Sequence, residues 1–472
     1  MPTECSADLF GFAPVEGREV VAAFDGGAIT SDAGALLLGA ADRAIKLTER
    51  LAACFHDVRR QDLIEHEVVT LVGQRVFGIA LGYEDLNDHD RLRYDVVMGV
   101  LSEKDEPSGT DRMRKKDQGK PIAGKSTLNR LELTPEEANE KSRYKKIVAD
   151  GAAIDELMVE VFIESYPCAP SEIVLDIDAT DDPLHGHQEG RYFHGYYAEY
   201  CYLPLYIFCG EHLLCARLRS ADKDPASGVL PELVRIVEQI RALWPEVRII
   251  VRGDSGFCRD EIMRYCEHNP NLDYVLGLAK NSRLNKAIDT EMAEAQKLHQ
   301  ATQKPARVFK DFRYRTRKSW SYERRVVGKA EYLAKGENPR FIVTSIQSEQ
   351  IDARALYEDF YCARGEMENR IKEQQLGLFA DRTSTSWMRS NQLRLYFSSF
   401  AYILVHALRR VGLTGTELAN AQCDTIRLKL FKIGAQIRVS VRKVWISFSE
   451  SYPYFNLFQQ VLLRLQQIPL RC

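Results

Sequence analysis

The chain has 472 residues, of which 45% are hydrophobic and 28% are charged, and its formal net charge is −3. This length suits about two to four domains, and the small net charge excludes a global field that would attract nucleic acid. The first residues, "MPTECSADLFGF", lack a basic segment followed by an apolar run, and the longest apolar stretch, "YFSSFAYILVHAL", is too short to cross a bilayer. We therefore expect a cytoplasmic protein with no membrane partner.

The cysteines and histidines give weak signals. Eleven cysteines occur without any C-x-x-C pair, which indicates neither a disulfide framework nor a zinc knuckle. Cys258 is considered as a reactive thiol, although no activating base stands nearby in the sequence. His185 and His187 in "HGH" offer two imidazoles to zinc, but no further soft ligand is evident, and a hairpin turn explains them as well.

Residues 1–165 form the first predicted region, which is mainly helical. Apolar residues recur at intervals of three and four in "DAGALLLGAADRAI" and "LIEHEVVTLVGQRVFGIAL", which indicates amphipathic helices. A polar, Lys-rich loop over residues 103–125 precedes a short helix, "STLNRLEL". Helices with exposed Lys and Arg are typical of DNA-binding regions, so we predict DNA binding here, with a helical support domain as the alternative.

Residues 119–126 of this loop read "GKPIAGKS" and match G-x-x-x-x-G-K-[ST], the pattern of loops that bind nucleotide phosphates. Such a loop follows a buried strand, because that setting aims its backbone N–H groups at the phosphates. The preceding "TDRMRKKDQ" is too charged for a buried strand. The pattern therefore favours a basic loop in which Lys120 and Lys125 contact the DNA backbone over an ATP-binding loop.

The pattern changes at Pro167, and residues 166–285 predict the first part of an α/β core. Three strands come first, "EIVLDIDAT", the long "YAEYCYLPLYIFC", and "LLCARLRS". The helix "LPELVRIVEQIRALW", the strand "VRIIVRGD", the helix "RDEIMRYCEH" and the strand "DYVLGLA" follow. Consecutive strands followed by alternating helices and strands predict a mixed sheet flanked by helices, in the order expected of an RNase H-like core.

The remaining sequence divides into three regions. Residues 286–354 contain a helix and then alternating, turn-separated segments, which predict a β-rich insertion. Residues 355–410 return to helix with "DARALYEDFYCARGEMENRIKEQQ" and "SNQLRLYFSSFAYILVHALRR" and complete the core. Residues 411–472 form a basic C-terminal extension that ends in an amphipathic helix.

Acidic residues near the ends of two strands are candidate metal ligands. Asp176 and Asp178 alternate on the strand "IVLDIDATDD" and therefore point to the same face of the sheet. Asp254 ends the strand in "VRIIVRGDSGF", where a mixed sheet commonly presents functional groups. The alternative is that these aspartates only cap the turns that follow.

A later helix adds a third carboxylate. In "YCARGEMENRIKE", Tyr361, Arg364, Glu368 and Lys372 fall within an arc of about 80° on one helix face. The alternative is a solvated row of ion pairs. Taken together with the strand-end aspartates, Glu368 completes a set of oxygen ligands that suits Mg²⁺ or Mn²⁺.

These motifs resemble those of a known family. The order of "DIDATD", "RGDSGF" and "YCARGEMENRIK" resembles that of the DDE transposases of bacterial insertion sequences, in the branch with a β-rich insertion before the last acid. The resemblance covers about residues 25–410 in layout, and the spacing Y-x-x-R-x-x-x-E is its most specific part.

The resemblance implies a catalytic triad of carboxylates formed by Asp178, Asp254 and Glu368. Asp178 is preferred over Asp176 because the family often reads Asp-x-Thr at this point, which "DAT" matches. Two Mg²⁺ or Mn²⁺ ions held by the triad would activate a water, and later a 3′-hydroxyl, for in-line attack on DNA phosphodiesters.

The resemblance also implies DNA contacts near the triad. Arg364 and Lys372 would hold phosphate oxygens, and Tyr361 would hydrogen-bond the DNA backbone or pack beside the site. The family commonly has a further Lys seven residues after the Glu, where this chain has Gln375, so that DNA contact is not expected.

The insertion contains a strongly basic segment, "KDFRYRTRKSWSYERRVVGK", with eight Lys or Arg and two acids. Such a patch, with Arg315, Arg317 and Lys318, suits contact with the DNA backbone. The inserted module of similar enzymes suggests that Trp320 stacks on an extruded base. The alternative is an exposed hairpin with a packed Trp.

The sequence thus predicts a DNA transposase that binds the terminal inverted repeats of an insertion sequence, cleaves at the ends and joins the 3′ ends to target DNA. We expect it to act on double-stranded DNA as a homodimer in the synaptic complex, in a bacterial cytoplasm at the nucleoid. Two alternatives remain, a metal-dependent nuclease on the same fold and a DNA-binding protein derived from a transposase that no longer cleaves.

Overall fold

The computed structural model describes residues 9–468, which form two compact units. The central unit comprises residues 150–399, and the terminal unit combines the residues up to 149 with those from 400 onward. The first boundary therefore lies near residue 149 rather than 165. The terminal unit also joins the two ends of the chain, which the sequence pattern had placed in separate regions.

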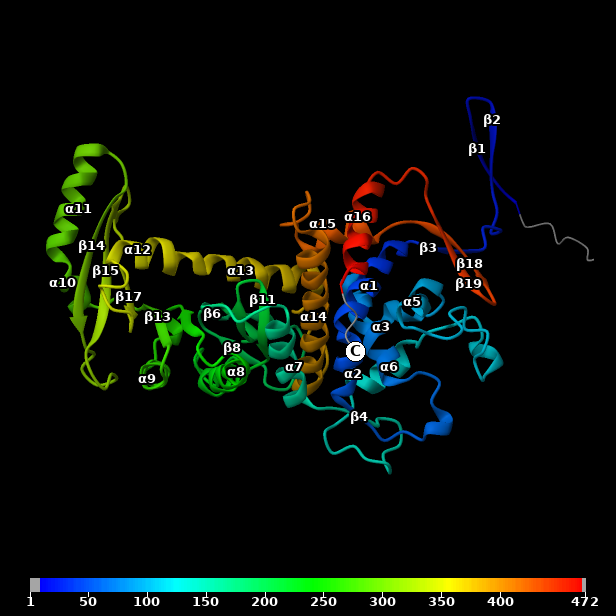
Figure 1. The fold of residues 1–472 in the computed structure, drawn as a ribbon, viewed down its shortest axis with the longest axis horizontal. Coiled ribbons are helices and arrows are strands. Elements are labelled where there is room, and N and C mark those ends of the chain that lie inside the picture. The colour runs from blue at the N-terminus through cyan, green and yellow to red at the C-terminus, as the bar shows by residue number, and fades with distance from the viewer. Residues whose placement is uncertain (1–8, 469–472) are drawn as a thin grey trace, which may run out of the picture. The chain divides into compact units, whose positions relative to one another are not determined.

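A nine-stranded mixed sheet forms the centre of the central unit (Figure 1). Its strands are β6 (Glu172–Ala179), β10 (Leu205–Cys209), β11 (His212–Arg217), β12 (Arg248–Gly253), β13 (Leu272–Leu278), β14 (Ala306–Tyr314), β15 (Arg324–Leu333), β16 (Gly336–Glu337) and β17 (Arg340–Thr344). They follow the order β11-β10-β6-β12-β13-β17-β15-β14, and β16 pairs with β15. β10 runs antiparallel to β6 and β11, whereas β12 is parallel to β6 and β13. This confirms the predicted α/β class and the RNase H-like order of the first five strands.

Three helices cover one face of this sheet, the face toward which Leu175 and Ile177 of β6 point. They are α7 (Gly151–Glu164), α8 (Val229–Leu243) and α9 (Asp260–His268). Phe162 of α7, Ile236 of α8 and Met263 of α9 are buried in the same hydrophobic cluster as the two β6 residues. Because α7 packs in this cluster, it belongs to the core and not to the N-terminal helical region.

A long helical segment, here called the covering helix (residues 353–377), lies over the opposite face. It consists of α12 (Ala353–Ala355), a π-helical turn (Leu356–Tyr361), a 3₁₀ turn (Cys362–Arg364), α13 (Gly365–Lys372) and a second π-helical turn (Glu373–Gly377). Leu356 and Tyr357 pack on Ile250, Val275 and Ile342 of the sheet. π-Helical turns occur frequently at functional sites. The covering helix is thus packed directly on the sheet face that carries the predicted acids.

The predicted β-rich insertion continues the core sheet. After α10 (Ser282–Ala287) and α11 (Asp289–Thr302), its strands β14, β15 and β17 form antiparallel pairs, and β17 also pairs with β13. This pairing satisfies the edge of β13, whose backbone groups would otherwise lack partners. Residues 286–354 therefore extend the sheet and do not form a separate module.

A small sheet connects β6 to β10. It contains β7 (Asp182–Pro183), β8 (Tyr192–His194) and β9 (Glu199–Tyr202), in the order β7-β9-β8. The long strand predicted over "YAEYCYLPLYIFC" is thus divided, because Leu203 and Pro204 separate β9 in the small sheet from β10 in the large one. The proline lacks the N–H group that a continuous ladder would need.

The terminal unit has more residues in helices than in strands. Its elements are α1 (Leu36–Ile45), α2 (Leu47–Ala53), α3 (Val68–Ala80), α4 (His89–Leu92), α5 (Val96–Leu101), α6 (Lys125–Glu132), α15 (Cys423–Ile426), α16 (Phe455–Gln466), β1 (Phe10–Val15), β2 (Arg18–Ala22), β3 (Ala28–Thr30), β4 (Phe55–Asp57), β5 (Ile147–Ala149), β18 (Ala435–Ser440) and β19 (Lys443–Phe448). β3 pairs with β18. At Gly34 an added Cβ would lie 1.8 Å from the carbonyl oxygen of Leu430, so the two ends of the chain pack too closely there for any side chain.

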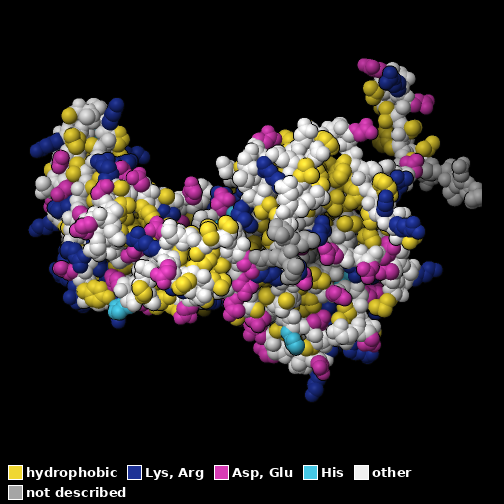
Figure 2. All heavy atoms as spheres, viewed as in Figure 1, with side chains coloured by type: hydrophobic (Ala, Val, Ile, Leu, Met, Phe, Trp, Pro, Cys, Tyr) yellow, Lys and Arg dark blue, Asp and Glu magenta, His cyan; other side chains and the backbone are white. Residues whose placement is uncertain are grey.

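One further helix, α14 (Met388–Leu408), includes the boundary at residue 399. Within residues 9–468, no helix combines the length and the apolar character needed to cross a membrane. On the face shown in Figure 2, positive and negative side chains are interspersed.

Candidate active site

The first two predicted acids lie on β6 and point toward the covering helix. Asp176 is buried and accepts hydrogen bonds from Arg252 at 2.6 Å (Nε to Oδ1) and 2.8 Å (Nη2 to Oδ2). Arg252 is the register partner of Asp176 on β12 and also donates to the carbonyl oxygen of Phe360. Asp176 therefore helps to hold the covering helix on the sheet, and Asp178 is the acid at the open end of the strand.

Asp254 lies at the same edge of the sheet as Asp178. It directly follows β12, and because β12 and β6 are parallel neighbours, their carboxyl ends meet at one edge. Its side chain accepts a hydrogen bond of 2.7 Å from the backbone N–H of Gly256. This bond fixes the orientation of the carboxylate, so the capping role expected as the alternative is present, and it leaves the predicted role in the site possible in geometry.

Glu368 reaches the site from α13, and Arg364 connects it to Asp178. The Arg364 guanidinium lies 3.4 Å from Oδ2 of Asp178 and 3.1 Å from Oε1 of Glu368. The side chain of Asp178 is 15% exposed and that of Glu368 is 46% exposed. The structure thus brings together an acid from a strand and an acid from the covering helix, with one cation between them.

The pKa of Asp178 reflects its burial first and the charges around it second. Burial raises the pKa of Asp178 to about 6, and Arg364 lowers it, whereas Asp254 and Glu368 raise it further by adding negative charge. When all are ionised, the three carboxylates outnumber the single guanidinium of Arg364 and leave this group of four side chains with a net negative charge. Additional positive charge placed among them would stabilise their ionised forms.

Gly277 of β13 allows the covering helix to approach Asp254. A Cβ added at Gly277 would lie 2.6 Å from the hydroxyl oxygen of Tyr361 and 2.8 Å from the backbone nitrogen of Ser255. Tyr361 thus packs over the glycine, beside the turn that carries Asp254. Burial raises the pKa of Tyr361, so its hydroxyl stays protonated. No local sequence pattern marks Gly277, because its neighbours Tyr361 and Ser255 come from other parts of the chain.

The three carboxylates match a Mg²⁺ or Mn²⁺ site in the type of ligand, since all donors are oxygens. As the side chains lie, no group of three or more His, Cys, Asp or Glu residues within residues 9–468 is arranged to hold an ion. Arg364 instead makes contacts with two of the predicted ligands. The residues therefore fit a divalent ion by chemistry, and Glu368 and Arg364 would have to separate for all three acids to share it.

A family model described as "Transposase DDE domain group 1" matches residues 12–470. The chain belongs to the DDE transposases. A search of curated proteins found no match. A cryo-EM structure of the piggyBac transposase in a synaptic complex with hairpin DNA is similar to this chain, with 11% sequence identity, coverage of 93% of this chain and 83% of that one, and a TM-score of 0.40.

Some of the basic residues that were predicted to contact DNA are exposed in this transposase. Lys372 is exposed at the end of α13, and Arg315, Arg317 and Lys318 are exposed in the hairpin between β14 and β15. Their roles in DNA binding stay predictions.

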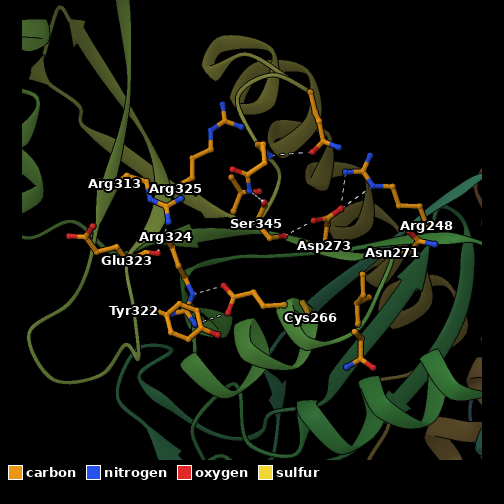
Figure 3. Close-up of a pocket in the computed structure, with 16 residues that line it drawn as sticks. Arg248, Cys266, Asn271, Asp273, Arg313, Tyr322, Glu323, Arg324, Arg325 and Ser345 are labelled. Atoms are coloured by element: carbon orange, nitrogen blue, oxygen red, sulfur yellow. Dashed lines mark hydrogen bonds and ion pairs between the residues drawn. The ribbon is translucent and has the colours of Figure 1, made fainter.

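The other basic residues of the insertion are largely neutralised. Arg324 bonds to Asp260 and Glu267, and Arg325 bonds to Asp311. Figure 3 shows Arg324 and Arg325 at a pocket of about 590 Å³. The positive charge counted in the sequence therefore overstates the charge available to DNA, because both arginines are buried in ion pairs.

The placement of Trp320 does not support the predicted stacking on a base. Its side chain is only 4% exposed and belongs to the main hydrophobic cluster of the central unit. Its ring packs edge-on against Tyr314 at 5.7 Å, and the guanidinium of Arg324 lies 5.5 Å from its centre. The alternative, a packed Trp beneath a hairpin, describes this residue correctly.

The loop over residues 119–126 is not a nucleotide-binding loop. A 3₁₀ turn (Lys115–Asp117), and not a strand, precedes it, so its backbone is not presented as in phosphate-binding loops. The side chain of Lys125 lies 3.3 Å from Asp90 and 3.2 Å from Asn87. Lys125 is half-exposed at the start of α6, and its contact with DNA stays a prediction.

The minor candidates have structural explanations. Burial raises the pKa of Cys258 to about 12, so its thiol is not activated. His185 and His187 lie in the connection between β7 and β8, and within the described residues they belong to no metal-binding group. Gln375 donates to the carbonyl oxygen of Asp181 at 3.0 Å, which ties the covering helix to the connection after β6.

Proposed function

We propose that this DDE transposase binds the terminal inverted repeats of an insertion sequence, cleaves the DNA at the ends and joins the 3′ ends to target DNA. The observation that carries the proposal is the convergence of Asp178, Asp254 and Glu368 from two strand ends and the covering helix, around Arg364. The family assignment supports the same chemistry. Because two DNA ends must be paired, we propose that a homodimer acts in the synaptic complex.

Asp178, Asp254 and Glu368 would hold two Mg²⁺ or Mn²⁺ ions. When bound, such ions lower the pKa of a water or 3′-hydroxyl and stabilise the charge that develops on the phosphate. Asp254 is held in place by its bond to Gly256, whereas the half-exposed Glu368 is free to turn. Arg364, released from the two acids, would donate its N–H groups to phosphate oxygens, as guanidinium groups do well. Exposed Lys372 would add a contact to the DNA backbone.

Replacing Glu368 by glutamine should abolish both cleavage and joining, with a rate loss of about 100-fold or more, because one charged ligand is lost. The assay measures Mg²⁺-dependent cleavage and joining of DNA that carries the ends of the flanking element. DNA binding should be retained, since Glu368 repels phosphate. Glu294→Gln, the same change at an exposed position on α11, is the matched control and should be fully active.

Three results would contradict parts of the proposal. Unchanged activity of Glu368→Gln would remove Glu368 from the site. Cleavage without joining by the unmodified protein would favour the metal-dependent nuclease. Neither reaction on verified ends, with DNA binding retained, would favour the non-cleaving DNA-binding protein.

A further inference from the structure

The connection between β6 and β10 carries an unusual density of aromatic residues. We call residues 182–202, which include β7, β8 and β9, the aromatic flap; it contains Tyr192, Phe193, Tyr196, Tyr197 and Tyr200, among others. Since β6 and β10 are antiparallel neighbours, with Asp178 opposite Tyr206, their connection leaves the sheet at the edge where Asp178 lies. The flap therefore begins only a few residues beyond a predicted catalytic acid.

Several rings of the flap are exposed. The exposed fraction is 86% for Tyr196 and 57% for Phe193, and Tyr200 is also exposed. Phe193 and Tyr200 face each other across β8 and β9, with ring centres 5.5 Å apart. The guanidinium of Arg191 lies 3.8 Å from the centre of the Tyr200 ring. One face of this hairpin thus presents two rings and a cation, and Tyr196 projects from its tip.

The flap lies within electrostatic range of the acids. Burial raises the pKa of Tyr197 to about 12, and the carboxylates of Asp181 and Asp178 add to this rise. The ring of Tyr197 lies 5.0 Å from that of Tyr196. A DNA end whose phosphate reached Asp178 would therefore have its terminal nucleotides close to the exposed rings.

The base of the flap is held firmly. The backbone N–H of Leu184 donates to the carbonyl oxygen of Tyr200 at 2.8 Å, and the hydroxyl of Tyr202 donates to the carbonyl oxygen of Glu189 at 2.5 Å. The backbone N–H of Glu189 in turn donates to Ser386 at 2.9 Å. The backbone that carries the exposed rings is therefore held by hydrogen bonds at its base, which lowers the entropic cost of stacking on a ligand.

We propose that Phe193, Tyr196 and Tyr200 stack on unpaired bases of the DNA end that is held at the carboxylates. The inference rests on the proposed function. Aromatic rings accept any base, and a neighbouring guanidinium attracts the backbone, so such a surface suits single-stranded nucleotides without sequence preference. The buried Trp320 does not supply this surface in the structure. The flap thus takes the role that the sequence had suggested for the insertion.

The test compares two fluorescein-labelled duplexes of identical sequence, one blunt and one with a few unpaired nucleotides at the 3′ end. Binding of the full chain is measured by fluorescence anisotropy in Ca²⁺, without cleavage. The unmodified protein should bind the frayed duplex more tightly. Tyr196→Ala and Phe193→Ala should each weaken binding of the frayed duplex about tenfold, with little change for the blunt one, because one base stack is lost.

Two further variants separate stacking from other effects. Tyr196→Phe keeps the ring and should retain the preference for frayed DNA. Tyr322→Ala removes a ring that is 40% exposed at the pocket in Figure 3 and should change nothing. This pocket also contains Arg248 and Asp273, which lie at the N-terminal ends of β12 and β13, away from Asp254. Since Tyr196 is 86% exposed, its truncation should not affect folding.

The inference is overturned if Tyr196→Ala and Phe193→Ala retain the preference for frayed DNA, or if they lose affinity equally for both duplexes. Its outcome is independent of the catalytic test. Loss of the preference in flap variants, combined with undiminished cleavage by Glu368→Gln, would support the flap and contradict the proposed chemistry. An intact preference in flap variants, combined with inactive Glu368→Gln, would contradict the flap and leave the chemistry standing.

Discussion

Replacing Arg252 by methionine should lower the free energy of unfolding of the central unit by about 3–5 kcal/mol, because it leaves the buried carboxylate of Asp176 without its partner. The exposed fraction is 7% for Arg252 and 5% for Asp176, so water cannot take over the lost bonds. Arg252 also holds the carbonyl oxygen of Phe360, and its loss should loosen the covering helix. The measurement is the unfolding midpoint in a denaturant titration.

Two further variants serve as a control and as a rescue for the effect of Arg252→Met. Arg248→Met, on the same strand, removes a partly exposed arginine that pairs with Glu172 and Asp273, and should cost only about 1 kcal/mol or less. Adding Asp176→Leu to Arg252→Met removes the orphaned charge and should restore much of the stability. Equal stability of Arg252→Met and the unmodified protein would show that the pair does not hold the helix on the sheet.

Replacing Gly277 by alanine should reduce cleavage by about 100-fold or more, although glycine and alanine differ by one methyl group. The new Cβ would lie 2.6 Å from the Tyr361 hydroxyl, 2.8 Å from the Ser255 nitrogen and 3.1 Å from the carbonyl carbon of Asp254. The phenol can move, but the backbone beside Asp254 cannot do so without displacing the carboxylate. Displacements of about 1 Å at a reacting centre commonly cost about 100-fold. The rate is measured in the same cleavage assay.

The stability of Gly277→Ala should fall by only about 1–3 kcal/mol, as for other overpacked sites. The double variant Gly277→Ala with Tyr361→Phe removes the contact with the hydroxyl but not the contacts with the backbone, so its activity should remain low. Gly365→Ala is the matched control, because nothing lies within 4 Å of an added Cβ at this start of α13. Normal cleavage by Gly277→Ala would show that the precise position of Asp254 is unimportant.

The sheet and the placement of its acids could be predicted from local patterns. Asp176 and Asp178 alternate on a strongly apolar strand, and the period of a strand alone places them on one face. Asp254 ends another such strand, and parallel neighbours share an edge. The helical period predicted that Arg364 and Glu368, four residues apart, lie on one face, and the bond between them confirms this. The irregular π-helical and 3₁₀ turns before α13 do not disturb this pair.

Features that depend on distant partners could not be predicted in this way. Arg252 interrupts an apolar strand, which is the one local sign that a buried acid stands opposite it. The burial of Trp320 depends on α9, whose Asp260 and Glu267 bind Arg324 above the ring. Likewise, the pairing of β17 with β13 joins segments about 70 residues apart, as the bond between Thr344 and Tyr274 illustrates. A basic, aromatic segment looks the same in sequence whether its charges are free or paired.

The exposure of the rings in the aromatic flap could not be predicted for a related reason. The letters "YAEYCYLPLYIFC" have the composition of one buried strand, although they end the flap and form β10, and Pro204 lies between the two. Exposed and buried rings alternate within the flap itself, since Tyr200 is exposed and Tyr202 is buried. Tyr200 is exposed in β9, whereas Tyr206 is fully buried in β10. Composition alone therefore could not tell the exposed rings of the flap from those in the core.

The most direct test of the account is the metal dependence of the Asp178→Cys variant. A thiolate is a softer ligand than a carboxylate and binds Mg²⁺ poorly, whereas it accepts Mn²⁺ more readily. If Asp178 holds the ion, DNA cleavage by this variant should fall about 100-fold or more in Mg²⁺ and recover at least about tenfold in Mn²⁺, relative to the unmodified protein in the same ions. Cleavage at the unmodified rate in Mg²⁺ would contradict the central claim that the carboxylates at this sheet edge form the metal site of a DNA-cleaving enzyme.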